Sequence, residues 1–388
     1  MIVYCRRCVM PETKPDLHIG PNGICSACRN FEEAKAIDWD ARQAQLAEVL
    51  ERYRVPASGY DCLIPVSGGK DSHYQVLRVL ELGARPLCVT ATTDKLTDIG
   101  RRNVENLKSL GVDYVEVTTN PRVRRKINRL ALREVGDISW PEHVTIFTIP
   151  VRIAAQTGIR LIVWGENPQN EYGGPAAAAA NSVLDRRWLE EFGGLLGLRV
   201  SDLVGQDGID AADLTQYTYP TDEELKRVGV TGVFLGYFTP WDGYGNALYA
   251  QAHGFETYPR AVEGSLVNYE NLDNAQTGIH DYFKFLKYAF GRATDLACMH
   301  VRRGRLRREE ALELVRLHDG RFPWSYLGVG LEEILNDIEM PLDEFQRICD
   351  RFTNKKLFLT DARGSLVKGA DGSLTKVNYD NPQDEAAA

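Results

Sequence analysis

The sequence contains no apolar run of 18 residues, so it has no segment of the length that a transmembrane helix needs. Its first residues, MIVYCRRCVMPE, also lack the apolar stretch of a secretory signal peptide. We therefore expect a cytoplasmic protein with no membrane partner. Because thiols stay reduced in the cytoplasm, paired cysteines in this chain indicate a metal site and not disulfides.

The sequence also lacks the basic balance that is typical of nucleic-acid-binding proteins. It has 46 Lys and Arg against 54 Asp and Glu, a formal net charge of −8, so we expect no nucleic-acid partner. Two local basic runs remain, at residues 122–133 and 302–308. We interpret both as solvated helix faces; the alternative is that one of them receives phosphates or a partner protein.

Apolar segments alternate with amphipathic ones through the first half of the chain. The pattern predicts strands at residues 61–66, 85–94, 113–119 and 159–167. Helices are predicted at 38–54, from the glycine turn to 83, and at 97–111, the last capped by Thr97 or Asp98 and ended by Gly111. This alternation predicts an α/β fold with a doubly wound parallel sheet, which binds ligands at the carboxyl ends of its strands.

The segment PVSGGKDS, residues 65–72, directly follows the first predicted strand and opens a helix. Unpaired backbone N–H groups and the helix dipole favour an anion there, and the two glycines let the backbone form a phosphate nest. The lysine can neutralise phosphate charge, and Asp71 can hold Mg²⁺. The spacing is not that of a Walker A loop. The candidate ATP-binding residues of this loop are Ser67, Gly68, Gly69, Lys70, Asp71 and Ser72.

This loop resembles the SGGxDS signature of the PP-loop ATP pyrophosphatase superfamily, whose members cleave ATP between the α and β phosphates. The resemblance implies a PP-loop (adenine nucleotide alpha hydrolase-like) sheet with ATP and Mg²⁺ as ligands. It also places the end of the second strand, Ala91, Thr92 and Thr93, near the adenosine.

Two CxxC pairs stand near the N-terminus, Cys5 with Cys8 and Cys25 with Cys28. Four thiolates at this spacing favour a structural zinc ribbon, in which every ligand position of the ion is used. Bound zinc would add folding energy to a segment too small for its own core. An iron–sulfur cluster and a metal-free group of thiols are the alternatives. The other cysteines, Cys62, Cys88, Cys298 and Cys349, are interpreted as buried packing residues.

The fourth predicted strand runs into WGENPQNEYGG, residues 164–174. Polar groups at that strand end face the same crevice as the phosphate loop. Gly165 is predicted to contact ATP, Glu166 to orient or deprotonate the nucleophile, and Asn167 to hold the substrate carbonyl. The alternative is a polar loop with helix caps.

In combination, these motifs with RRWLEEFGGLLGLR (186–199) and GIHDYFKFLKYAFGRATDLA (278–297) resemble the N-acetyl sugar amidotransferase family of bacterial lipopolysaccharide O-antigen and nonulosonic-acid biosynthesis. The resemblance implies that ATP adenylylates the acetamido oxygen of a UDP-linked N-acetyl sugar and that ammonia replaces it, giving an acetamidino group, AMP and pyrophosphate. One departure is the alanine run at 176–180, which puts the role of that segment in doubt.

The resemblance implies catalytic roles for Lys70, Asp71, Glu166 and Asn167. The candidates for the sugar-nucleotide pocket are Glu171, Tyr172, His280, Tyr282, Lys284 and Arg292. No Cys–His–Glu glutaminase set is recognisable, so the resemblance implies two partners, a glutaminase subunit and a barrel-like subunit that channels ammonia.

We divide the chain into a zinc-ribbon-like segment at 1–35, a PP-loop domain at 36–265 with a Gly/Ala-rich loop near 173–200, and a mostly helical region at 266–388. Residues 232–255, rich in glycine and aromatics, are predicted to line a pocket. Two other functions remain open. A PP-loop tRNA thiolase is disfavoured by the acidic balance and the contexts of the remaining cysteines, and a nucleotide-sensing module by the intact loops.

Overall fold

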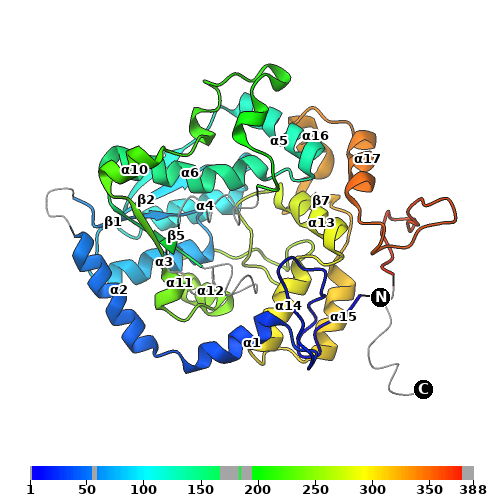
Figure 1. The fold of residues 1–388 in the computed structure, drawn as a ribbon, viewed down its shortest axis with the longest axis horizontal. Helices are drawn as coiled ribbons and strands as arrows, with labels where there is room; N and C mark the ends of the chain where they lie inside the picture. The colour runs from blue at the N-terminus through cyan, green and yellow to red at the C-terminus, as the bar shows by residue number, and fades with distance from the viewer. Residues whose placement is uncertain (1, 55–58, 167–182, 185–194, 378–388) are drawn as a thin grey trace.

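The computed structural model describes residues 2–54, 59–166, 183–184 and 195–377 (Figure 1). Its centre is a six-stranded sheet with the order β3-β2-β1-β4-β6-β5. The strands are β1 (Cys62–Pro65), β2 (Pro86–Ala91), β3 (Asp113–Val117), β4 (Leu161–Trp164), β5 (Val183–Leu184) and β6 (Thr231–Phe234). All pair in parallel except β5, which runs antiparallel to β6. The predicted parallel α/β sheet is confirmed.

Helices cover both faces of this sheet, so the predicted doubly wound arrangement is also confirmed. The covering helices are α2 (Trp39–Tyr53), α3 (Lys70–Glu81), α4 (Asp98–Lys108) and α6 (Trp140–Thr157). Successive strand residues point to opposite faces, and each face has its own core. Cys62 and Ile64 lie in the core formed with α2 and α3, whereas Leu63 lies in the core formed with α6. The order of the strands reverses between β1 and β4.

The predicted helix limits agree closely with the structure. The helix predicted at 38–54 is α2, and α4 begins after Thr97, whose Oγ1 accepts a hydrogen bond of 3.0 Å from the Gly100 N–H. The strand β6 was not predicted. It belongs to the segment predicted to line a pocket, which forms β6 and the helices α11 (Leu235–Phe238) and α12 (Gly243–Gln251). Strand β6 has four residues, three of them buried, and so short a segment cannot show a strand period.

The region after α12 is mostly helical, as predicted. Its helices are α13 (Thr277–Tyr288), α14 (Arg292–Arg302), α15 (Arg308–His318), α16 (Leu331–Asp337) and α17 (Leu342–Phe352), with a small hairpin of β7 (Ser325–Tyr326) and β8 (Val329–Gly330). Phe283 of α13 and Phe345 of α17 lie in one core with residues of α16 and with Leu132 of α5 (Pro121–Val135). This core joins the helical region to the α/β part.

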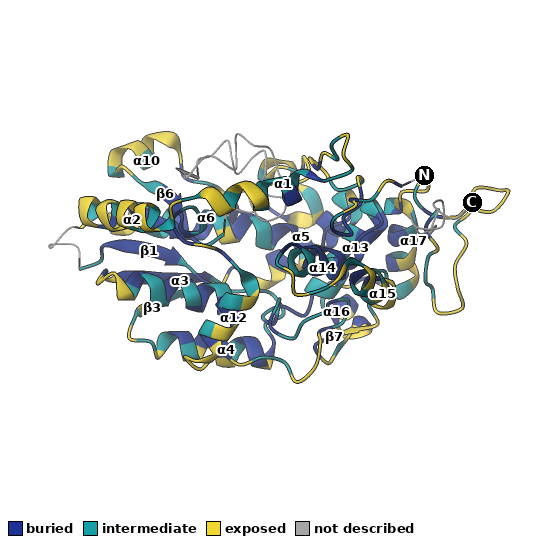
Figure 2. Ribbon diagram, turned by 90° about the horizontal axis from the view of Figure 1, so that it is seen from below, coloured by how far each residue is buried: buried dark blue, intermediate teal, exposed yellow. Residues whose placement is uncertain are grey.

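The cysteine-rich segment near the N-terminus lies against α14 and α15 (Figure 1). Thr13 Oγ1 donates to the Tyr288 carbonyl at 2.5 Å, and Arg308 Nε donates to the Cys8 carbonyl at 3.1 Å. Figure 2 shows buried residues concentrated in the strands and between the helices, and exposed ones along the outer faces of α2 and α10 (Asp222–Val228). No helix in the described part of the chain combines the length and apolarity needed to cross a bilayer.

Candidate functional site

The loop between β1 and α3 is tightly held. Gly68 has φ +86°, and a Cβ there would lie 2.7 Å from Val104 Cγ2 on α4, so a larger residue would clash. The Ser67 N–H donates to Ser72 Oγ at 2.9 Å, and the Gly69 N–H donates to Ser67 Oγ at 3.3 Å. The loop therefore curls over the first turn of α3, which is the geometry expected of an anion site at a helix N-terminus.

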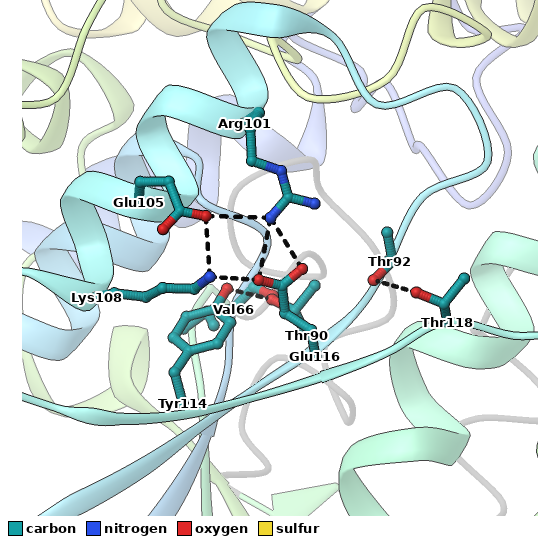
Figure 3. A network of polar contacts seen from close by, with 9 residues as sticks. All are labelled: Val66, Thr90, Thr92, Arg101, Glu105, Lys108, Tyr114, Glu116 and Thr118. Atoms are coloured by element: carbon teal, nitrogen blue, oxygen red, sulfur yellow. Dashed lines mark hydrogen bonds and ion pairs between the residues drawn. The ribbon is translucent and has the colours of Figure 1, made fainter.

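A polar network fixes the strands beside this loop (Figure 3). Thr90 Oγ1 on β2 donates to the Val66 carbonyl and also contacts Tyr114 on β3. At the outer edge, Glu116 accepts from Arg101 at 3.0 Å and from Lys108 at 2.6 Å, which ties α4 to β3. The Thr90 bond ties β2 to the first residue of the loop, and the Glu116 pairs fix the neighbouring helix α4.

The predicted adenosine contacts lie at the carboxyl end of β2. Ala91 is the last residue of the strand, and the Thr92 N–H donates to the Val117 carbonyl at 3.0 Å. Thr92 Oγ1 accepts from Thr118 Oγ1 at 3.2 Å (Figure 3), and Thr93 Oγ1 donates to the Asp273 carbonyl at 3.4 Å. Their role toward adenosine stays a prediction.

Lys70 is buried, with 7% of its side chain exposed, and it contacts two carboxylates. Its Nζ lies 2.5 Å from Asp71 Oδ2 and 2.8 Å from Glu270 Oε1. Burial would lower the pKa of Lys70, but the two carboxylates outweigh burial and raise that pKa. Burial would likewise raise the pKa of Glu270, but Lys70 lowers it. Both shifts favour the charged forms of the two groups, in keeping with the rule that buried charges are paired.

Asp71 is oriented from a second side. Asn246 of α12 is buried, and its Nδ2 donates to Asp71 Oδ1 at 2.8 Å. The Asp71 side chain is 34% exposed, whereas the neighbouring Lys70 is almost covered. The carboxylate thus reaches solvent beside the phosphate loop, where an oxygen ligand suits Mg²⁺ bound to phosphates.

The second predicted loop begins at the end of β4. The Gly165 carbonyl accepts from the Gly236 N–H at 3.0 Å, and a Cβ at Gly165 would lie 3.2 Å from Gln75 Oε1. Strand β1 pairs in parallel with both β2 and β4. The loops that follow β1, β2 and β4 therefore lie together at the carboxyl edge of the sheet, at the point where the strand order reverses. Glu166 follows Gly165 and is half-buried. Asn167, Glu171, Tyr172 and the alanine run lie outside the described residues.

The remaining predicted sugar contacts come from α13 and the start of α14, and three of the four are paired with a carboxylate. His280 Nδ1 lies 2.8 Å from Asp137 Oδ1, Lys284 pairs with Asp295, and Arg292 Nη2 lies 3.0 Å from Asp281 Oδ1. Tyr282 is buried in the core of α13, where burial raises the pKa of its hydroxyl.

Two of these four residues line a common cavity. Tyr282 and Arg292 line a cavity of 330 Å³ within the helical region, together with Asp281, Trp324 and Tyr326. His280 and Lys284 are not among its lining residues. The structure therefore does not gather the four side chains into one pocket, and their contact with substrate stays a prediction.

The four predicted metal ligands do converge. Cys5, Cys8, Cys25 and Cys28 are fully buried, and their sulfurs all lie within 4.8 Å of one another. The Cys5–Cys28 and Cys8–Cys25 sulfurs are 4.0 and 3.8 Å apart. Zn–S bonds of about 2.3 Å in a tetrahedron place sulfurs about 3.8 Å apart, so these residues fit a zinc ion.

Sequence reasoning missed Glu270 and Asn246. Glu270 lies in the polar stretch 268–276 before α13, and Asn246 lies in α12. Neither residue belongs to a recognisable motif. The one sequence feature that marks Glu270 is the polar run in which it lies, between apolar segments. Both reach the phosphate loop through tertiary packing.

The region that contains Glu270 is similar to a known protein family. Residues 254–369 match the family model of the LPS biosynthesis protein WbpG-like, C-terminal domain. The match spans less than a third of the chain, and we refer to residues 254–369 as the WbpG-like domain after the family that this region is similar to. This agrees with the predicted resemblance to a family of bacterial surface-polysaccharide biosynthesis. The WbpG-like domain contributes α13 to α17 and the Glu270 carboxylate on Lys70.

Solved structures that match include NMN synthetase from Francisella tularensis, at 16% identity, with 55% of this chain and 91% of that chain covered and a TM-score of 0.28. NAD+ synthetase from Burkholderia pseudomallei matches at 15% identity over 62% of this chain and 91% of that chain, with a TM-score of 0.24. No curated protein matched the sequence.

Proposed function

We propose that this protein is an ATP-dependent sugar amidotransferase, a ligase that converts the acetamido group of a nucleotide-linked N-acetyl sugar into an acetamidino group. The observation that carries the proposal is the contact between Lys70 of the phosphate loop and Glu270 of the WbpG-like domain. It brings a helix N-terminus suited to phosphate together with a region that is similar to the C-terminal domain of a lipopolysaccharide biosynthesis protein.

The reaction needs an activated amide, because an amide carbonyl is a poor electrophile. The acetamido oxygen attacks the α phosphorus of ATP, pyrophosphate leaves, and an O-adenylyl imidate forms. Ammonia then adds to the imidate carbon, the C–O bond to AMP breaks, and the nitrogen loses a proton. Positioning and charge neutralisation supply most of the catalysis in such transfers.

Different residues of the site bind the phosphates, neutralise their charge and position the reacting groups. Backbone N–H groups at Gly68 and Gly69 and the Ser72 hydroxyl hold the pyrophosphate portion of ATP, and Lys70 offsets its negative charge. Asp71 would hold Mg²⁺, which when bound neutralises phosphate oxygens. Glu166 accepts the proton from the attacking nitrogen, and Asn167 holds the substrate carbonyl.

Ammonia must come from a partner under this proposal. We assign that role to a glutaminase subunit and a barrel-like channelling subunit, with a UDP-linked N-acetyl sugar as the acceptor and the cytoplasm as the place of reaction. The rival tRNA thiolase activity is less well supported, because all eight cysteines are buried. Burial also raises the pKa of the Cys62 thiol, and it raises that of Cys88 to about 12, whereas sulfur chemistry needs an accessible thiolate.

The test is an assay of AMP and pyrophosphate release from Mg-ATP with a UDP-linked diacetamido sugar and ammonium. Mass spectrometry of the sugar should show the mass change for replacing O by NH, in step with AMP. Lys70→Ala should lose AMP formation by about 100-fold or more, while Lys95→Ala, which removes a partly exposed lysine, should not. AMP formation at the same rate with and without the sugar would contradict the proposal.

A further inference from the structure

Three side chains from separate parts of the fold meet beside the first turn of α6. Asp137 lies in the turn between α5 and α6, His143 lies on α6, and His280 lies on α13 of the WbpG-like domain. The Asp137 side chain is 4% exposed, against 24% for His143 and 28% for His280. One possible ligand atom from each residue can be chosen so that all lie within 4.8 Å of one another.

The buried ring nitrogen His143 Nδ1 is the least well hydrogen-bonded atom of this cluster. Asp137 Oδ1 accepts from the Ser139 N–H at 2.9 Å and contacts His280 Nδ1 at 2.8 Å. His143 Nδ1 is buried and lies 3.2 Å from Asp137 Oδ2, an ion-pair contact whose alignment falls short of a regular hydrogen bond. A poorly aligned hydrogen bond stabilises a buried ring nitrogen only weakly, and a cation bound between His143 and Asp137 would satisfy both groups.

The spacing and the donor types fit a metal ion. Metal–nitrogen and metal–oxygen bonds of about 2.0–2.2 Å place neighbouring ligand atoms of a tetrahedral ion about 3.3–3.6 Å apart. The Asp137 oxygens lie 2.8 Å from His280 Nδ1 and 3.2 Å from His143 Nδ1, within about half an ångström of that separation. Two imidazoles and one carboxylate are ligands that Zn²⁺ and related divalent transition metals accept, whereas Mg²⁺ prefers oxygen ligands alone. Three protein ligands also leave a coordination position open.

The cluster lies on the side of the sheet where the phosphate loop opens. Helix α6 enters β4 through the short turn at Gly158, so its first turn lies at the carboxyl edge of the strands. Nearby, Asn274 Nδ2 donates to Glu142 Oε2 at 2.6 Å and Gln276 Nε2 donates to Asp94 Oδ2 at 3.2 Å. Both contacts join the WbpG-like domain to the α/β part around the cluster.

We propose that Asp137, His143 and His280 form a second metal site of this chain, which binds a divalent transition-metal ion such as Zn²⁺. The site is separate from the four-cysteine cluster, which lies against α14 and α15, and from the Mg²⁺ position at Asp71. The ion joins α13 to the α5–α6 turn and presents its open position to solvent through the half-buried imidazoles. The proposal does not depend on the sugar amidotransferase activity.

The experiment is a titration of the full-length chain, freed of any purification tag and with zinc in its cysteines, with Co²⁺ as the probe. Nitrogen and oxygen ligands give cobalt d–d absorption without the thiolate-to-cobalt charge-transfer bands of a cysteine site. We expect saturable d–d absorption at one equivalent per chain. His143→Gln and His280→Gln should each weaken Co²⁺ binding about tenfold or more, whereas His253→Gln, at an exposed histidine of another surface, should not.

A second measurement uses only the parent protein, so its result does not depend on whether the variants fold. Total zinc in the parent protein, after equilibration with zinc and removal of the free ion, should exceed the four-cysteine equivalent by one further ion per chain. The proposal is overturned if Co²⁺ gives only thiolate charge-transfer bands, if no second equivalent binds, or if folded His143→Gln and His280→Gln bind Co²⁺ as the parent does.

Discussion

Lys70 Nζ lies 2.8 Å from Glu270 Oε1, so the phosphate loop and the WbpG-like domain share one buried ion pair. The same ammonium contacts Asp71 on its other side. The lysine is therefore held by two carboxylates at the place where the phosphates of ATP are proposed to bind. The contact makes the charge of the phosphate loop dependent on a residue of the other domain.

Glu270→Gln should weaken both stability and ATP use. Lys70 stays charged and largely buried but keeps its contact with Asp71, so the unfolding free energy should fall by about 2–3 kcal/mol, less than the roughly 3–5 kcal/mol for a buried charge left without a partner. AMP formation should fall by about tenfold or more as the lysine loses its fixed position. Urea unfolding and the AMP assay measure the two effects. The matched control is Glu333→Gln, which removes an exposed partner of Lys95 and should change stability by less than about 1 kcal/mol. Equal effects of the two variants would contradict the prediction.

Asn246→Ala should raise the Mg²⁺ concentration needed for activity. Asn246 donates to the Asp71 carboxylate at 2.8 Å, so its loss leaves the proposed metal ligand free to rotate. Loss of such an outer contact typically costs about 10–100-fold in metal affinity. The measurement is AMP formation over a Mg²⁺ series at fixed ATP. An unchanged Mg²⁺ requirement would show that Asp71 does not bind the ion.

Removal of metal from the four-cysteine cluster should loosen the helices packed on it. Cys298 of α14 and Ala311 of α15 lie in the same core as the four cysteines, and Arg308 donates to the Cys8 carbonyl. Cys8→Ser should therefore lose the bound zinc, lower the melting temperature and speed hydrogen exchange in α14 and α15. Cys349→Ser, at a buried cysteine of a different core, should keep the zinc. Unchanged exchange in both helices would count against the assignment.

The parts of this molecule that could be predicted from its sequence depend on local pattern. The strand–loop–helix at residues 62–81 and the Cys5–Cys28 spacing each carry their signal within a short segment, and the structure has the parallel sheet and the buried thiols that they predict. Glu270 and Asn246 reach the loop only through packing between distant segments, which leaves no mark in their neighbourhood. The family resemblance predicts that His280 contacts the substrate. Its contact with Asp137 joins residues that are far apart in the sequence, so no local pattern could predict it.

Asp273→Asn should stabilise the protein at alkaline pH. Burial and the nearby Glu142 raise the pKa of Asp273 to about 7, whereas the unfolded chain releases this proton near the usual pKa of about 3.9. The folded state binds the extra proton between these values, so the ionised Asp273 reduces stability as pH rises through that window. The advantage of Asp273→Asn should grow from pH 5 to pH 8 by about 1–3 kcal/mol. Melting temperatures at both pH values measure it.

Asp40→Asn, at an exposed carboxylate of α2, is the control for Asp273→Asn. Its stability relative to the parent should stay nearly constant from pH 5 to pH 8. A constant difference for Asp273→Asn as well would mean that the Asp273 carboxyl titrates normally in the folded protein.

The packing of the cysteine-rich segment on α14 and α15 has a consequence for biosynthesis. Residues 5–28 leave the ribosome long before Arg308, Ala311 and Val315 are translated, yet these later residues form one side of the core that covers the cysteines. A nascent chain that has already captured zinc must keep that apolar side exposed until α15 emerges. Translation pauses before residue 308 would therefore lengthen the time in which the segment is open to aggregation or to chaperones.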